Sequence, residues 1–101
     1  MKRYVAVLAI AGLVLGGVAS PAHVARGTFS YTVGFREPHL VDPPNNVCHT
    51  LAEAVPARRL TNSTDARALV FNEPDCHTFV SDLEPGETAS PVMTGRSVTF
   101  L

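Results

Sequence analysis

The N-terminal segment decides how much of this chain is left to fold. Lys2 and Arg3 precede an uncharged apolar run from Tyr4 to Val18, and the small residues Ser20 and Ala22 follow it. This order of charged, apolar and small segments is typical of a secretory signal peptide. A membrane-spanning helix needs about 20 apolar residues, which makes an uncleaved anchor the less favoured alternative. We expect residues 1–22 to be a signal peptide, cut after Ala22, and residues 23–101 to be a secreted, extracellular domain.

The predicted mature chain is short, weakly acidic and free of lysine. It has 101 − 22 = 79 residues, and its 6 basic and 9 acidic side chains give a formal charge of 6 − 9 = −3. Its arginines are dispersed along the chain, so no stretch can neutralise a row of nucleic-acid phosphates. For the same reason no stretch can bind an anionic membrane surface. We therefore expect no nucleic-acid partner and no stable membrane insertion after cleavage. One domain of this size has a marginal core unless a cross-link supports it.

Two cysteines, Cys48 and Cys76, are expected to supply that cross-link. Both remain after cleavage, and export places them in an oxidising compartment, where cysteines pair. They are 76 − 48 = 28 residues apart, and closing such a loop contributes about 3.5 kcal/mol in the chain-entropy model. A zinc site is the alternative, because His49 and His77 each follow a cysteine. Adjacent strand residues point to opposite faces and cannot easily ligate one tetrahedral ion, so we predict a disulfide, no metal and no cofactor.

Alternation of polar and apolar residues predicts an all-β fold. The two clearest segments, 28–33 and 96–101, lie near the two ends of the mature chain. Their same-face residues are Phe29, Tyr31 and Val33 in the first and Val98 and Phe100 in the second. Further strands are expected at 47–51 and 77–83. Helix-forming composition is confined to 51–55, which Pro56 ends after one turn at most.

Turn-forming residues predict how these strands connect. Strands at 58–61 and 67–72 are expected to form a hairpin around the turn formers 62–65. Residues 37–46 hold three prolines and are predicted to be a loop, and 84–87 (Glu-Pro-Gly-Glu) a tight turn. Together the elements predict a small Greek-key-like sandwich or barrel of about six short strands.

Two short patterns allow more than one interpretation. Asn62-Ser63-Thr64 matches the N-glycosylation sequon, although we favour a turn without a sugar. Cys48-His49-Thr50-Leu51 is echoed by Cys76-His77-Thr78-Phe79, which indicates either duplicated β-units or a chance match.

The segment from Cys48 to Leu101 resembles small secreted actinobacterial proteins that carry one disulfide. The matching elements are Cys48, Asn62 with Thr64, Leu69-Val70-Phe71, Asp75-Cys76, Leu83-Glu84-Pro85-Gly86 and Gly95-Arg96-Ser97-Val98-Thr99-Phe100. At a greater distance the segment is similar to the βγ-crystallin-like Greek-key proteins, which include secreted bacterial metalloproteinase inhibitors and killer-toxin-like proteins. The calcium motif of that superfamily is absent from the predicted hairpin loops, so the resemblance implies no calcium site.

The sequence predicts a binding protein rather than an enzyme. No nucleophile elbow, zinc-binding helix or phosphate loop is present, and a chain this short has difficulty enclosing a dry catalytic pocket. Residues 88–95 are apolar at their centre, at Pro91, Val92 and Met93, and are flanked by Pro and Gly. Such a loop on a rigid scaffold could enter a protease cleft. The favoured alternative is a simple connection with Val92 and Met93 packed inward.

We therefore expect a small secreted non-enzymatic protein that binds an extracellular macromolecule, such as a protease. One alternative is an extracellular protease inhibitor. Another is a structural or self-associating protein of the cell surface, because the alternating segments 28–33 and 96–101 could pair through exposed sheet edges.

Overall fold

The computed structural model describes residues 23–101 as an all-β domain, and the predicted signal peptide lies outside the described residues. None of the elements in this part of the chain is a helix long and apolar enough to cross a membrane. The strands are β3 (Gly27–Thr32), β4 (His39–Val41), β5 (His49–Thr50), β6 (Arg58–Thr64), β7 (Ala68–Phe71), β8 (Phe79–Leu83) and β9 (Ser97–Phe100). Among residues 23–101 there are thus seven strands, against about six expected.

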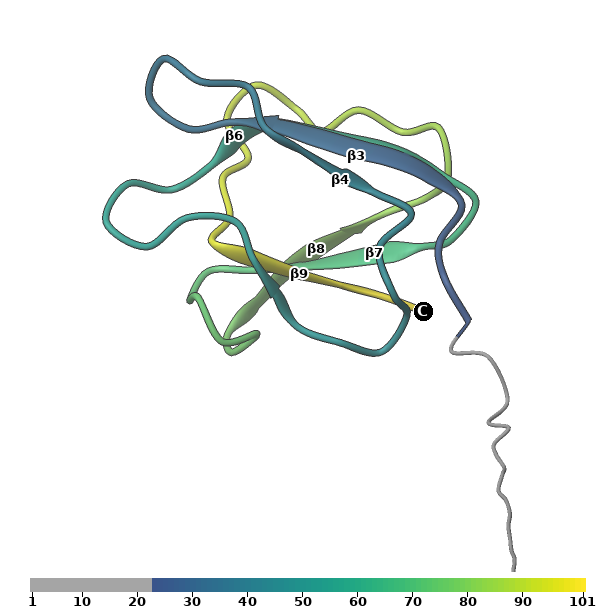
Figure 1. Ribbon diagram of the computed structural model, residues 1–101. Coiled ribbons are helices and arrows are strands. Elements are labelled where there is room, and N and C mark those ends of the chain that lie inside the picture. The colour runs from purple at the N-terminus through teal and green to yellow at the C-terminus, as the bar shows by residue number, and fades with distance from the viewer. Residues whose placement is uncertain (1–22) are drawn as a thin grey trace, which may run out of the picture.

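The strands form two antiparallel sheets that face each other (Figure 1). The three-stranded sheet has the order β4-β3-β6, and the four-stranded sheet has the order β5-β9-β7-β8. Two facing sheets confirm the predicted all-β class and make the fold a small sandwich. The alternating strands nearest the two ends of the described chain, β3 and β9, each lie between two neighbours, so their edges are already paired.

The predicted hairpin of 58–61 with 67–72 is wrong. Strand β6 pairs with β3, whereas β7 pairs with β8 and β9, so residues 65–67 carry the chain from one sheet to the other. Strand β6 also continues through the expected turn, because Asn62 and Thr64 follow Leu60 on its buried face. The turn-forming composition misled the prediction, since these polar side chains find hydrogen-bond partners inside the domain.

The proline-rich segment 37–46 contains a strand that was not predicted. Residues His39–Val41 form β4, which pairs with β3 at the edge of its sheet. Pro38 and Pro43 flank this strand rather than interrupt it, and an edge position tolerates such neighbours. By contrast, the expected turn at 84–87 is confirmed by a 3.0 Å hydrogen bond from Glu87 N to Glu84 O.

The sequence echo around the two cysteines is not repeated in the structure. His49 and Thr50 form strand β5, whereas the second copy lies in a turn in which Cys76 and Thr78 have φ angles of 63° and 62°. Extended and left-handed backbones differ fundamentally, so the two matching segments do not form equivalent structural units.

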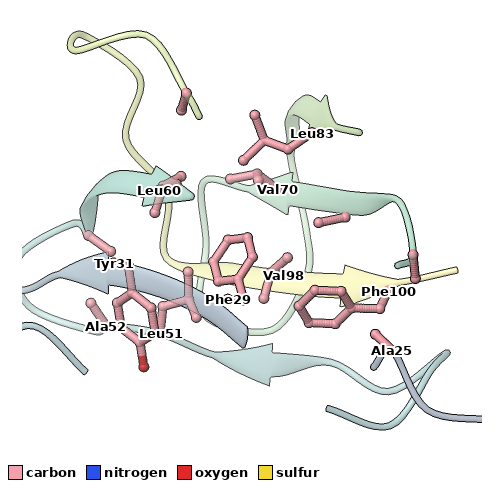
Figure 2. Packing of buried hydrophobic residues seen from close by; sticks show 14 residues of the cluster. Ala25, Phe29, Tyr31, Leu51, Ala52, Leu60, Val70, Leu83, Val98 and Phe100 are labelled. Atoms are coloured by element: carbon pink, nitrogen blue, oxygen red, sulfur yellow. The ribbon is translucent and has the colours of Figure 1, made fainter. Parts of the chain in front are cut away.

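The core lies between the sheets and is built from the predicted faces of the alternating strands. Phe29 of β3 and Phe100 of β9 meet edge to face, with ring centroids 5.5 Å apart (Figure 2). Tyr31 and Val98 are also buried, and Val33 packs partly against the cluster. Aromatic pairs of this geometry add about 0.5–1.5 kcal/mol beyond the area that they bury. The remaining large core residues are Leu51, Leu60, Val70 and Leu83.

Candidate binding surface

The hairpin that joins β3 to β4 presents an aromatic side chain to solvent. Val33 N donates to Arg36 O over 2.9 Å, and Arg36 N donates to Val33 O over 3.0 Å. Gly34 has a φ of 62° at the first central position, which glycine adopts without strain and which two-residue hairpin turns require. Phe35, at the second central position, is fully exposed. A hydrogen-bonded turn therefore holds a phenyl ring in water.

A second loop, residues 51–57, leaves the sandwich at the same end as this hairpin. Strand β3 ends opposite the start of β6, with Thr32 beside Arg58, so the chain after β3 and the chain before β6 emerge together. Both loops project from the left of the molecule in Figure 1. Val55 in this loop is 58% exposed.

A third segment, residues 88–95, follows the outer edge of β6 to the same end. Thr88 forms a bridge with Thr61 in β6, and Gly95 forms another with Ala57 just before β6. Gly95 is buried, and a Cβ there would collide with the core side chain of Val70, so this contact requires glycine. We call the hairpin and these two loops the loop end (residues 33–36, 51–57 and 88–95).

The predicted binding residues Pro91, Val92 and Met93 lie in a β-turn within the third segment. Met93 N donates to Ser90 O over 3.0 Å, which closes the turn around Pro91 and Val92. Pro91 is exposed and Val92 is 88% exposed, whereas Met93 packs partly against the core. Of the two side chains that the alternative placed inward, only Met93 lies there. The role of this turn in binding stays a prediction.

The loop end gathers a disproportionate share of the arginines. Arg36, Arg58 and Arg59 are exposed in or beside it, which is half of the six arginines in residues 23–101. Three of the nine acidic residues lie in or beside the same loops, namely Glu37, Glu53 and Glu87. The ion pairs of the described chain lie elsewhere, so these three guanidinium groups are available to a partner.

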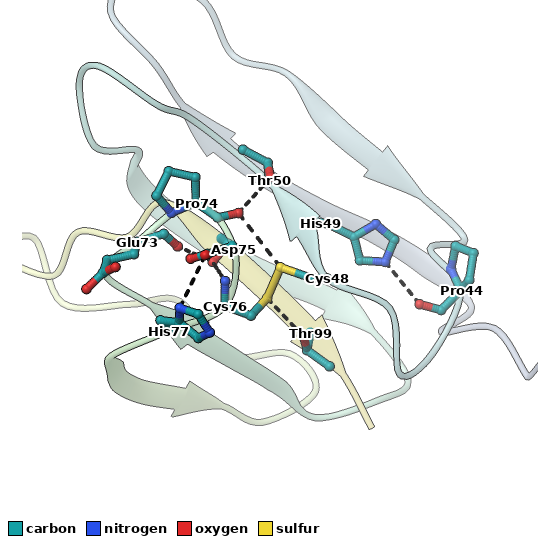
Figure 3. The surroundings of a disulfide bond; sticks show 11 residues. Pro44, Cys48, His49, Thr50, Glu73, Pro74, Asp75, Cys76, His77 and Thr99 are labelled. Atoms are coloured by element: carbon teal, nitrogen blue, oxygen red, sulfur yellow. Dashed lines mark hydrogen bonds and ion pairs between the residues drawn. A yellow bond between two sulfur atoms is a disulfide. The ribbon is translucent and has the colours of Figure 1, made fainter.

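The two cysteines form the predicted disulfide, which excludes them as zinc ligands. Cys48 and Cys76 have Cα atoms 5.9 Å apart and sulfurs bonded to each other (Figure 3). The bond ties the chain before edge strand β5 to the loop 72–78, which folds over the start of β9. Cys76 N donates to Ser97 Oγ over 2.9 Å, and Ser97 Oγ donates in turn to Glu73 O. The disulfide therefore anchors a loop that covers one strand of the larger sheet.

Three side chains with metal-ligating atoms lie together beside this disulfide. The ligand atoms of Glu73, Asp75 and His77 lie within 4.8 Å of one another, and all three residues are exposed. His77 Nδ1 lies 3.2 Å from Asp75 Oδ2, and Thr78 Oγ1 donates to Glu73 Oε2 over 2.7 Å. These groups therefore already bond within their own loop. This cluster was not predictable from the sequence, because the left-handed residues Cys76 and Thr78 of the turn bring its members together.

The predicted sequon contains a buried asparagine rather than an exposed turn residue. Asn62 is 0% exposed, and its Nδ2 donates to Ala66 O over 2.8 Å and to Leu83 O over 2.9 Å. Its Oδ1 accepts bonds from Thr64 N at 3.1 Å and Thr64 Oγ1 at 2.6 Å. A sugar would be attached to the same nitrogen that makes the first two bonds. The folded domain thus uses Asn62 as a structural group and leaves no room for a glycan.

A small open hollow lies close to the loop end. Its volume is about 220 Å³, whereas small-molecule pockets usually hold about 300–1,000 Å³. Burial raises the pKa of Tyr31, which lines it, and the Arg36 guanidinium partly opposes that rise. The residues that line the hollow are Ser30, Tyr31, Thr32, Glu37, Arg59 and Thr61.

Sequence reasoning identified one of the three exposed apolar loops. The turn at Pro91 and Val92 was singled out, but Phe35 and Val55 were not. Gly34 after the alternating segment 28–33 was a signal for a turn, but residues 36–41 do not alternate, so nothing local marked the return strand of a hairpin. Comparison with known proteins finds no matching family model, no significantly similar curated protein and no significantly similar solved structure.

Proposed function

We propose that residues 23–101 form a secreted, non-enzymatic domain that binds another extracellular macromolecule through the loop end. The observation that carries this proposal is the full exposure of Phe35 on a hydrogen-bonded turn. The disulfide is compatible with an oxidising extracellular setting.

Burial of Phe35 against a partner would release the hydrophobic free energy that its exposure in the isolated domain leaves unused. Moving a phenylalanine side chain from water into an apolar contact is worth about 1.5–3 kcal/mol. Its turn is already ordered by the reciprocal bonds between Val33 and Arg36, so little conformational entropy is lost on binding. Aromatic residues and arginines are also the side chains that most often dominate protein interfaces, and Arg36 is the next residue.

The other loops extend this contact. Val55 and Val92 are exposed apolar residues on separate loops at the same end, and Arg58 lies at the base of one of them. An apolar centre with arginines around it favours a macromolecular partner that presents an apolar patch bordered by acidic groups.

The test is retention of extracellular proteins by the immobilised, oxidised domain. The producing organism's secreted fraction is passed over wild type, Phe35→Ser and Val41→Ser. Val41 is also exposed and apolar, but it lies at the far end of β4 from the hairpin, which makes it a matched control. We expect wild type and Val41→Ser to retain the same partner and Phe35→Ser to retain it about 10- to 100-fold less tightly.

Equal retention by all three proteins, or no retention by any, would contradict the proposal. Equal loss in both variants would also contradict it, because the effect would then not belong to the loop end.

Protease inhibition is the second candidate, and the exposure of Val92 favours it. In this form the proposal places Val92, at the tip of the Ser90–Met93 turn, in the cleft of a secreted protease. Titration of secreted serine and metalloproteases with wild type and Val92→Asp tests it. Inhibition that Val92→Asp abolishes while the disulfide and β-structure persist supports this role. Inhibition unchanged by the substitution excludes the turn as the inhibitory element.

A further inference from the structure

Strand β6 contains a β-bulge where it pairs with the end of β3. Between two successive paired positions, β6 has two residues, Arg59 and Leu60, where β3 has only Tyr31. The extra residue interrupts the regular alternation of the strand and re-aims a side chain. Arg58 and Arg59 are accordingly both exposed, whereas a regular strand would turn one of them toward the core. The bulge therefore leaves two adjacent guanidinium groups in solvent.

Arg59 has a backbone conformation that its side chain disfavours. Its φ angle is 53°, in the left-handed region, where a Cβ crowds the following carbonyl oxygen. Five non-glycine residues between 23 and 101 have such an angle, and Arg59 is the only one of them that lies within a strand. A bulge residue with this backbone is usually glycine. Strained residues of this kind concentrate at functional sites, where the particular side chain is needed.

The hollow beside the loop end is lined by this arginine. Arg59 and Thr61 belong to β6, on one side of the central strand β3, and Glu37 belongs to the segment that leads to β4 on the other side. Ser30 and Thr32 alternate with buried residues of β3, so they face outward into the hollow. Its volume of about 220 Å³ is that of about seven water molecules. The hollow therefore has room for one side chain of a partner.

Positive charge predominates around the hollow. Arg59 lines it, and Arg58 is the adjacent residue. The Arg36 guanidinium lies near enough to oppose the raised pKa of Tyr31, which also lines the hollow. Glu37 is the one acidic residue of the lining, and neither it nor the three arginines form an ion pair within residues 23–101. This balance favours an anionic occupant, and the planar fork of a guanidinium matches a carboxylate.

We infer that the hollow is the subsite in which the loop end recognises one acidic side chain of its partner, and that Arg59 binds its carboxylate. The carboxylate accepts two parallel hydrogen bonds from the guanidinium. Glu37 repels a second carboxylate, so the subsite takes a single acidic residue. The inference rests on the proposed function and adds the chemistry of the partner, which carries an aspartate or glutamate next to the apolar surface that covers Phe35.

Retention of the producing organism's secreted proteins by the immobilised, oxidised domain tests the subsite. Wild type, Arg59→Gln and Arg26→Gln are compared at one ionic strength. Both substitutions remove one positive charge. Arg26 is also exposed but lies before the opposite end of β3, which makes it the matched control. We expect Arg59→Gln to retain the partner about 30-fold less tightly, and Arg26→Gln to retain it within about threefold of wild type.

Retention of the partner by both glutamine variants as tightly as by wild type would overturn this inference and leave the proposed function standing. Equal loss in the two variants would do the same, because the effect would then belong to net charge rather than to the hollow. No retention by wild type would overturn the proposed function and this inference together.

Phosphatase treatment of the secreted proteins identifies the anion. The enzyme removes phosphate groups and leaves aspartate and glutamate unchanged, so we expect wild type to retain the treated partner as tightly as the untreated one. Loss of retention after treatment would show that Arg59 binds a phosphate group, and would overturn the assignment of a carboxylate.

The variant Arg59→Gly separates a side chain kept for binding from one kept for folding. Glycine adopts the left-handed backbone without strain, so we expect the unfolding equilibrium constant of this variant to be about threefold lower than that of wild type. Its retention of the partner should fall as that of Arg59→Gln does. A glycine variant less stable than wild type would show that Arg59 serves the fold, and would overturn the inference.

Discussion

Asn62 and Phe35 reverse the usual relation between polarity and burial. A polar amide lies fully buried at Asn62, and a phenyl ring lies fully in water at Phe35. Both residues belong to the three-stranded sheet or its hairpin, and hydrogen bonds hold both in place. At Asn62 the bonds come from the side chain itself. At Phe35 they come only from the backbone of its neighbours Val33 and Arg36.

The difference separates a residue that the fold needs from one that it does not. A buried amide whose bonds are all satisfied costs the fold little, and its removal leaves its partners without bonds. An exposed ring contacts too little of its own domain to stabilise it, and in the proposed function it contacts a partner instead. We therefore expect substitution of Asn62 to lower the stability of the domain, and substitution of Phe35 to leave that stability unchanged.

Asn62→Ala should give the largest loss of stability. The substitution removes four hydrogen bonds from a buried site, and we expect the free energy of unfolding to fall by about 4 kcal/mol. Denaturant unfolding measures this loss. Ser63→Ala is the control, because Ser63 is the exposed neighbour within the same sequon, and it should change stability by less than about 0.5 kcal/mol. Equal effects at the two positions would show that the amide network is not what stabilises this corner.

Replacing both Cys48 and Cys76 by serine should cost slightly less, about 3.5 kcal/mol. The reason differs, because the cross-link acts mainly by restricting the unfolded chain. The uncross-linked chain unfolds to a more expanded state, so the dependence of stability on denaturant should also steepen. For Asn62→Ala that dependence should stay unchanged. A double cysteine variant as stable as wild type would contradict the anchoring of loop 72–78 by the disulfide.

Alkaline pH should reveal a smaller effect, at Tyr31, which lies beneath the hairpin that carries Phe35. Burial raises the pKa of Tyr31, and Arg36 opposes this only in part. The unfolded tyrosine titrates near pH 10, so the folded state holds its proton over the next interval of pH. The contribution of Tyr31 to the free energy of unfolding is therefore fully present below about pH 10. It is lost as the pH rises through the raised pKa of the folded state.

Tyr31 is the only tyrosine in residues 23–101, so tyrosinate absorbance reports its titration directly in the cleaved protein. Tyr31→Phe should remove the part of the alkaline stability loss that this group causes. A wild-type titration at or below the ordinary tyrosine pKa would contradict the burial of the phenol.

Local patterns predicted the parts of the fold that local patterns control. Alternation placed Phe29, Tyr31, Val98 and Phe100 in the core, and Pro85 with Gly86 marked a turn. The pairing of β6 with β3 was not predictable from composition, because the polar residues near Asn62 are typical of a turn. Their burial depends on carbonyl groups supplied by residues as distant as Leu83.

The candidate site was harder to predict, because it depends on how separate loops are brought together. Val92 was noticed within its own segment, but nothing local indicates that it leaves the sandwich at the same end as Phe35. That proximity comes from the register between Thr32 and Arg58 and from the bridge between Ala57 and Gly95. Sequence reasoning also assigned edge pairing to the outermost alternating strands, whereas both lie inside their sheets and β8 is exposed instead.

The central claim is that Phe35 is exposed for a partner and contributes nothing to its own fold. The most direct test is the free energy of unfolding of Phe35→Ser, compared with wild type in the same denaturant series. We predict a change of less than about 0.5 kcal/mol, as for a surface residue without contacts. A loss of more than about 1.5 kcal/mol, which is the scale of burying such a side chain, would show that Phe35 packs against the domain and would contradict the account.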